Sequence, residues 1–379
     1  MGSAERLIRG DTWNDFCDRL RDAGNAILRG PDDPLVRAEG FRYVSRLVRA
    51  GLEVFVEHAD PLAPELRRVV HETVKMGADN PDNHYLYATV SGEHRYRITG
   101  VRGGVHYLAF GAHSGHYGQG RGMPPVGHLD AKDIPVGADG TFTIELATPE
   151  ARVGDASAFL PLAPGITSII VRQTRLLPTE ELAALRIERL GGENLRPAPV
   201  DPATLDDALG QTGMLVAGAT LLFASWTEGF RAHENRLPRF DQALSNAMGG
   251  VPDIAYYHSF YNLRADEALV VEFTPPPCSS WNFQLNDYWM ESLDYRHFTI
   301  HTNSGRAVPR ADGSYQIVVA HRIPTSPFLQ GEPINWLETA GHAMGTMCFR
   351  WVRPEGEPPE PRTRVVTLDE LARERESAR

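Results

Sequence analysis

Two stretches of the chain share one pattern: residues 138–147 read ADGTFTIELA, and residues 311–320 read ADGSYQIVVA, at an offset of 173 (311 − 138) in the numbering. In each stretch the Asp-Gly dipeptide marks a turn, and the residues after it are typical of a strand. Two further pairs follow in the same order, Phe159-Leu160 with Trp336-Leu337 and Ile170-Val171-Arg172 with Cys348-Phe349-Arg350, at offsets of 177 (337 − 160) and 178 (350 − 172). We infer an internal repeat, because several elements recur in order at a nearly constant spacing.

Short strands with Gly- and Pro-containing turns dominate both copies. Upstream of the Asp-Gly turns, residues 96–99 and 105–110 resemble residues 270–273 and 281–286, at offsets of 174 (270 − 96) and 176 (281 − 105). Many short strands without alternating helices predict two tandem jelly-roll-like antiparallel β-sandwich units, a mixed but mainly β fold. Barrels without this pairing are the alternative architecture, and convergent β patterning is the alternative to a repeat.

Helical periodicity surrounds the two β units. Helices are expected in the N-terminal part of the chain, the third of them near residues 63–76, and again at residues 179–190 and from residue 202 to about residue 236. The expected division is an N-terminal helical segment (1–77), a first β-sandwich unit (78–178), a helical linker region (179–250), a second β-sandwich unit (251–355) and a C-terminal tail (356–379).

Composition narrows the class of protein. The chain has 379 residues and a net charge of −11 without a basic stripe, which argues against nucleic acid as the partner. Its three cysteines, Cys17, Cys278 and Cys348, are widely spaced and predict neither a disulfide framework nor a zinc knuckle. The apolar run 214–225 is shorter than the ~20 residues that cross a bilayer, so we expect a buried helix. A cytoplasmic location without membrane contact is the expectation, and a homo-oligomer is possible.

Several of these stretches resemble the bacterial proteins of the domain of unknown function 1214 family, whose members often also have the domain of unknown function 1254. The resembling residues are the runs NPDNHYLY (80–87), YRITG (96–100), WNFQL (281–285), ADG (311–313) and NWL (335–337). Glu338 departs from the family pattern, which usually has Pro after Asn-Trp-Leu, and residues 1–77 do not clearly resemble the 1254 domain. The resemblance implies two jelly-roll units and implies no named activity or catalytic residues.

Polar and aromatic residues of the second copy suggest a small-molecule site. His321 shares a strand face with Tyr315, Ile317 and Val319, where the first copy has apolar residues and a threonine. If the protein is an enzyme, His321 is the expected acid or base, oriented by Asp287, with Tyr288 donating a hydrogen bond. An inward histidine is also often only a hydrogen-bonded core residue. The expected substrate-binding residues, chosen because aromatic walls with a few polar groups form ligand pockets, are His258, Trp281, Asn286, Trp289 and His301.

Metal and cofactor motifs are not evident in the sequence. His113 and His116 form the densest histidine group, but they lie in a Gly-rich run without a carboxylate at ligand spacing. We expect a loop there whose glycines permit tight turns or close substrate approach, and we expect no metal and no tightly bound organic cofactor.

Three functions are consistent with the sequence. The first is an enzyme that uses His, Asp and Tyr acid-base chemistry on a partly apolar or aromatic metabolite. The second is a binding protein for a carbohydrate or hydrophobic metabolite, with the same aromatic residues. The third is a scaffold whose aromatic residues fill an interface between its units or between subunits.

Overall fold

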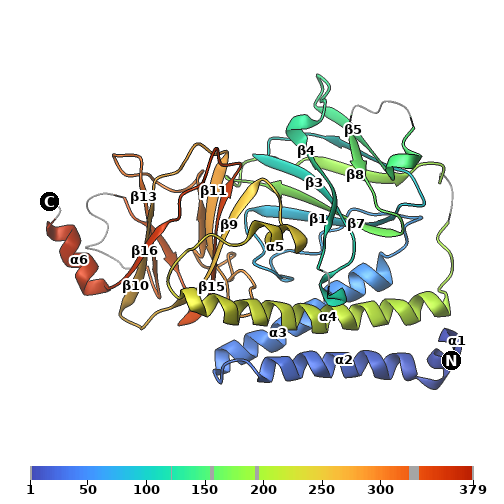
Figure 1. Ribbon diagram of the computed structural model, residues 1–379, viewed down its shortest axis with the longest axis horizontal. Coiled ribbons are helices and arrows are strands. Elements are labelled where there is room, and N and C mark those ends of the chain that lie inside the picture. Colours follow the sequence, from blue (N-terminus) through green and yellow to red (C-terminus); the bar gives the residue numbers. More distant parts are fainter. Residues whose placement is uncertain (1, 121, 154–157, 193–195, 324–332, 378–379) are drawn as a thin grey trace.

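The structure is a computed structural model that describes the chain except for residues 1, 121, 154–157, 193–195, 324–332 and 378–379 (Figure 1). Its helices are α1 (Ser3–Arg9), α2 (Asp11–Leu28), α3 (Pro34–Leu52), α4 (Pro202–Phe230), α5 (Gln242–Ala247) and α6 (Leu368–Ser377). The strands of the first unit are β1 (Asn83–Ser91), β2 (Tyr96–Val101), β3 (Tyr107–His113), β4 (Pro125–Asp130), β5 (Thr141–Ala147), β6 (Phe159–Pro161), β7 (Ile166–Thr174) and β8 (Ala184–Arg189). Those of the second are β9 (Ile254–Asn262), β10 (Glu267–Phe273), β11 (Ser280–Leu285), β12 (His301–Asn303), β13 (Tyr315–Ala320), β14 (Asn335–Glu338), β15 (Met344–Val352) and β16 (Arg362–Thr367).

The two β units have the same topology. In the first, one sheet has the order β1-β7-β3-β4 and the other β6-β5-β2-β8. In the second, the orders are β9-β15-β11-β12 and β14-β13-β10-β16, so every strand has its counterpart eight strands later. Each unit also contains one parallel pair, β5 with β6 and β13 with β14, among antiparallel neighbours. The predicted mixed, mainly β fold with two sandwich-like units is therefore confirmed.

Strand register confirms three of the predicted offsets and corrects two. Leu146 pairs with Leu160, and Val319 pairs with Leu337, which fits the offsets of 173 (319 − 146) and 177 (337 − 160). The bounds of β7 and β15 are offset by 178 at both ends (344 − 166 and 352 − 174), as predicted. The upstream offsets of 174 and 176 are wrong, since β2 and β3 also align with β10 and β11 at an offset of 173. Apolar residues recur along every strand, so two strand sequences can be aligned at several offsets when no turn residue marks the correct one.

Two expected helices are absent from the described chain. Residues 184–189 form β8, which pairs with β2, although their spacing of Leu and Ala suggested a helix. The first unit therefore extends past residue 178. Residues 63–76 contain only turns, bends and isolated bridges, so helix in the N-terminal segment ends with the π-helical turn Glu53–Glu57. At the other end, β16 pairs with β10, which makes most of the expected C-terminal tail part of the second unit.

Each sandwich has its own apolar core, and a helical layer covers both units. Buried side chains between the two sheets form one core in each unit. A third cluster joins α2, α3 and α4 to the second unit through residues such as Phe260 and Trp289. Figure 1 shows α4 running along both units, with α2 beside it. The two longest helices, α3 and α4, are capped at their N-termini, since Asp33 accepts from the Val36 amide at 2.9 Å and Asp201 from the Thr204 amide at 2.9 Å.

Helix α4 is the core helix expected from the apolar run 214–225. Among the described residues, it is the one helix long and apolar enough to cross a membrane by length and composition alone. Half of that apolar window is buried inside the protein, and Val216 and Ala219 are fully buried against the other helices. Its buried face therefore packs as that of a core helix.

Glycines allow α4 to approach the first unit. A Cβ atom at Gly218 would lie 2.5 Å from Cα of Gly118, which belongs to the Gly-rich run between β3 and β4. The sequence suggested that the glycines of this run permit a close approach to a substrate. In the structure, they permit a close approach to α4.

This contact predicts opposite effects of two substitutions in one helix. Gly218→Ala forces the backbones apart and should lower the free energy of unfolding by about 1–3 kcal/mol. Gly210→Ala adds a methyl group with no atom within 4 Å and should raise that free energy by roughly 0.5–1 kcal/mol, since alanine favours helix. Urea unfolding followed by circular dichroism measures both. Equal effects of the two substitutions would contradict the packing described here.

Candidate functional site

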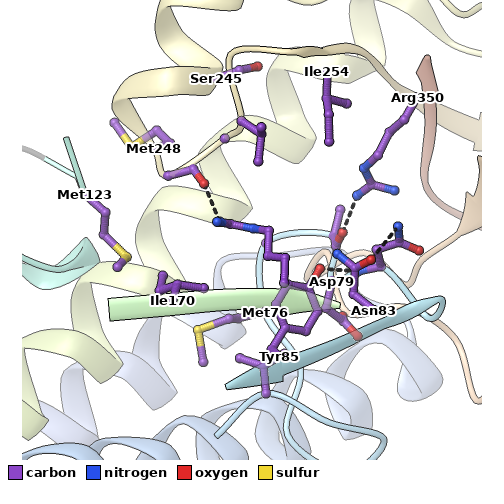
Figure 2. A pocket seen from close by; sticks show the side chains of 18 of the residues that line it. Met76, Asp79, Asn83, Tyr85, Met123, Ile170, Ser245, Met248, Ile254 and Arg350 are labelled. Carbon is purple, nitrogen blue, oxygen red and sulfur yellow. Dashed lines mark hydrogen bonds between the residues drawn. The ribbon is translucent and has the colours of Figure 1, made fainter. Parts of the chain in front are cut away.

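A cavity of about 220 Å³ lies where the two β units face each other under the helical layer. Its walls come from β1, β3 and β7 of the first unit, from β9, β11 and β15 of the second, and from α4 and the loop before β1. Figure 2 shows Met76, Met123 and Ile170 on one side and Asp79 and Arg350 on the other. The cavity therefore has an apolar part and a polar part.

The repeat places the same two side chains on both walls. In the first unit, Tyr85 of β1 is opposite Arg172 of β7, and in the second, Tyr256 of β9 is opposite Arg350 of β15. All four residues line the cavity. Their neighbours Val171 and Phe349 are fully buried in the two sandwich cores, so alternation along the strands directs both arginines out of the sandwiches.

Tyr85 and Tyr256 also accept equivalent hydrogen bonds from backbone amides. The phenol oxygen of Tyr85 accepts a hydrogen bond from the Asn80 amide at 3.0 Å, and that of Tyr256 accepts from the Val251 amide at 3.1 Å. In both cases the donor lies five residues before the tyrosine. This shared geometry supports the alignment of the two walls.

Arg350 is buried and held by neutral oxygen atoms. Its Nη1 donates to Oε1 of Gln284 at 2.6 Å, and its Nη2 donates to the Ala78 carbonyl at 2.6 Å. Gln284 in turn donates to the Asp79 carbonyl and to Oδ1 of Asn286. The polar row of β11, including Asn282, thus forms a buried hydrogen-bonded network that supports Arg350.

Arg172 has fewer protein partners. It is half-buried, and its Nη2 donates to the Gly249 carbonyl at 2.6 Å. Within the part of the chain that the structure describes, neither Arg172 nor Arg350 forms an ion pair with a carboxylate.

Two carboxylates at the rim of the polar part are engaged elsewhere. Asp79 accepts from the Ser292 amide at 3.0 Å and from its hydroxyl at 2.8 Å, and burial raises the pKa of Asp79. Asp82 contacts Nη2 of Arg306 at 2.5 Å and Nε2 of His301 at 3.2 Å. Burial acts to raise the pKa of Asp82, but these two partners outweigh it and lower that pKa.

Two histidines line the cavity. The His258 ring stacks on Phe230 and Tyr256, and burial lowers its pKa to about 3, so the imidazole is neutral. Its Nδ1 is buried and has no partner among the described residues. Nδ1 of His116 accepts from the Gly118 amide at 3.1 Å, which leaves Nε2 to donate to Gln211 at 2.8 Å.

The structure brings together only part of the site expected from the sequence. His258 and Trp281 line the cavity. His301 lies outside the lining, and its ring contacts Asp82, which is a lining residue. Asn286 supports Gln284 from behind. Trp289 lies outside the lining, buried under α2 and α3.

The proposed pairing of His321 with Asp287 has no support in the described contacts. His321 follows β13, and its ring nitrogens contact Thr339 and the carbonyls of Leu263 and Arg264. Asp287 follows β11 in the opposite sheet and accepts from the amides of Trp289 and Glu291, both at 2.9 Å.

The roles expected for Asp287 and Tyr288 in this catalytic group also gain no support from their surroundings. Burial, followed by the charges of Glu39 and Glu291, raises the pKa of Asp287 well above its ordinary value, which disfavours an anion that could orient a histidine. The Tyr288 hydroxyl donates to Glu228 of α4. Asp287, Tyr288 and Trp289 thus belong to a turn that attaches the helical layer.

A metal site at His113 and His116 gains no support from the described geometry. Nδ1 of His113 lies 3.2 Å from the Met123 carbonyl, and His116 is bonded to Gln211. No group of three His, Cys, Asp or Glu side chains arranged to hold a metal ion occurs among the residues that the structure describes.

The sequence analysis missed the two cavity arginines. Arg172 and Arg350 had been aligned by the repeat, but they were used only to mark equivalent strands. An arginine at the same position of two apolar strands, SIIVRQT (168–174) and TMCFRWV (346–352), was the available signal.

Comparisons with known proteins identify one close structure. No family model matches the chain, and no curated protein matches it. The crystal structure of an uncharacterised protein from Burkholderia cenocepacia is 48% identical, with a TM-score of 0.91, and the match covers 97% of this chain and 100% of that one. The VPA0106 protein from Vibrio parahaemolyticus is 12% identical with a TM-score of 0.48, over 92% of this chain and 100% of that one.

Proposed function

The chain belongs to the family of the Burkholderia cenocepacia protein, and we propose that it binds a small, partly apolar molecule in the cavity between its two β units. The observation behind this proposal is the lining itself. Apolar side chains such as Met123, Ile170 and Ile254 form one part of the cavity, and the tyrosines and arginines of both units form another. Apolar walls with a few fixed polar groups are typical of small-molecule sites.

Cavity size limits the ligand. An apolar cavity of about 150 Å³ holds benzene. A cavity of about 220 Å³ therefore accommodates one ring with roughly three or four additional non-hydrogen atoms.

Binding without catalysis is the alternative that the geometry favours. Acid-base chemistry at neutral pH needs a group whose pKa lies near 7. Burial lowers the pKa of His258 to about 3 and raises that of Tyr117 to about 12, so neither of these two lining groups suits that chemistry. The enzyme hypothesis with His321, Asp287 and Tyr288 remains a prediction without a supporting contact. Membership of the 1214 family and a cytoplasmic location also remain proposals.

Filling the cavity should abolish binding. Ile170→Trp adds bulk on the cavity wall, so neutral aromatic probes such as indole and 2-phenylethanol should lose saturation-transfer NMR signals that the unchanged protein gives. Val136→Trp adds the same group at an exposed position of the first unit and should keep those signals. Thermal unfolding confirms that both variants fold. Signals that survive Ile170→Trp, or a lack of signals from the unchanged protein, would refute the proposed function.

A further inference from the structure

We propose that the ligand of this cavity is a carboxylate with an aromatic or branched apolar body, held between Arg172 and Arg350. The inference rests on the function proposed above and adds the chemical class of the ligand. It starts from the two arginines that the repeat places on facing walls.

Neither cavity arginine forms an ion pair with a carboxylate of the described chain. Arg350 is 6% exposed, and burial of a guanidinium costs several kcal/mol unless an opposite charge lies close. Its partners, Gln284 and the Ala78 carbonyl, are neutral. Of the nearby carboxylates, Asp82 is paired with Arg306 and His301. Asp79 accepts from Ser292 and interacts at longer range with both Lys75 and Arg350, so one carboxylate is shared among several cations. An anionic ligand would supply the missing charge.

Both arginines retain donors that a ligand can use. A guanidinium has five N–H groups. Arg172 uses one of them for the Gly249 carbonyl, and Arg350 uses those directed to Gln284, Asn282 and Ala78. Adjacent N–H groups of a guanidinium match the two oxygens of a carboxylate, which a single neutral acceptor does not offer.

The rest of the lining determines the body of the ligand. Tyr85 and Tyr256 flank the arginines, and their rings offer flat apolar faces. Each phenol oxygen accepts from a backbone amide, which leaves its O–H group able to donate to a ligand. Met76, Met123 and Ile170 lie together on one side of the cavity and add further apolar surface (Figure 2). Within the volume estimated above, a single ring with a short carboxylate arm fills both parts. Phenylacetate is a molecule of this kind.

Calorimetry with a charged and a neutral probe of the same shape tests the inference. Phenylacetate should bind the full-length protein about 10- to 100-fold more tightly than phenylacetamide, because hydrogen bonds to charged groups contribute about 1.5–3 kcal/mol. Arg172→Gln should weaken phenylacetate binding by about tenfold or more and leave phenylacetamide binding within about twofold. Arg362→Gln, a change at an exposed arginine of β16, should leave both affinities unaltered.

Arg172 is the first variant because it has a single described protein partner and is only half-buried, whereas Arg350→Gln risks misfolding. Equal binding of phenylacetate and phenylacetamide would overturn the carboxylate inference and leave the small-molecule site intact. Unchanged phenylacetate affinity in Arg172→Gln, or no binding of either probe, would overturn it as well. The experiment with Ile170→Trp uses neutral probes and therefore decides the proposed function separately.

Discussion

Trp289→Ala should lower the free energy of unfolding by about 3–5 kcal/mol, the range for loss of a large buried aromatic side chain. The Trp289 ring is fully buried between the second unit and the helical layer. A Cβ atom at Gly40 of α3 would lie 2.7 Å from the ring, which shows how closely the helix packs on it. The indole Nε1 also donates to the Val36 carbonyl at 2.7 Å, so the substitution also removes a buried hydrogen bond.

Trp13→Ala is the matched control for this change. Trp13 lies on α2 and is 59% exposed, so its loss should change the free energy of unfolding by less than about 1 kcal/mol. Urea unfolding followed by far-ultraviolet circular dichroism measures both variants. A cost for Trp289→Ala below that of Trp13→Ala would mean that the helical layer does not pack on this turn.

Arg46→Met should lower the free energy of unfolding by about 3–5 kcal/mol at pH 8 and by much less at pH 5. Arg46 of α3 pairs with Glu291 at 2.7 Å, and the Glu291 side chain is 1% exposed. Burial raises the pKa of Glu291 to about 7, although Arg46 acts against this shift. Without Arg46, a buried and uncompensated carboxylate remains at high pH.

The sign of this pH dependence follows from proton binding. The folded protein holds a proton on Glu291 up to about pH 7, whereas the unfolded chain releases it near the ordinary value of 4.5. The stabilisation from this group is therefore complete below about pH 4.5 and is lost as the pH rises through about 7. Removing Arg46 raises the folded pKa further and steepens the loss.

The double variant Arg46→Met, Glu291→Gln removes the charge from both positions. It should recover most of the stability lost at pH 8 and show a weaker dependence on pH between 5 and 8 than Arg46→Met alone. Chemical unfolding at a series of pH values measures these differences. A cost of Arg46→Met that is the same at pH 5 and pH 8 would contradict a protonated Glu291 in the folded protein.

The β architecture could be predicted from the sequence because the residues that form a turn are neighbours in the chain. Asp139-Gly140 and Asp312-Gly313 each start a strand, and Gly140 and Gly313 both have a φ of +81°, which favours glycine. Once these turns were aligned, the alternation of apolar residues assigned the core faces of β5 and β13. The helix expected at residues 179–190 was wrong, because pairing with β2 overrides a local helical pattern in β8.

The site was harder to predict because it depends on how the two units face each other. Local patterns show that Asn282 and Gln284 share a strand face, but they do not show that the loop before β1 covers that face. Likewise, His321 and Asp287 follow nearby strands in sequence that belong to opposite sheets of one sandwich. The alignment of Arg172 with Arg350 could have indicated the site, since equivalent residues on facing walls can contact the same ligand.

The account depends most on the cavity between the two β units being the ligand site. A crystal structure of the protein with phenylacetate at saturating concentration tests this directly. We expect the carboxylate to contact Arg172 and Arg350, with the ring against the wall formed by Tyr85 and Ile170. Phenylacetate bound only elsewhere, or side chains that fill the cavity, would contradict the account.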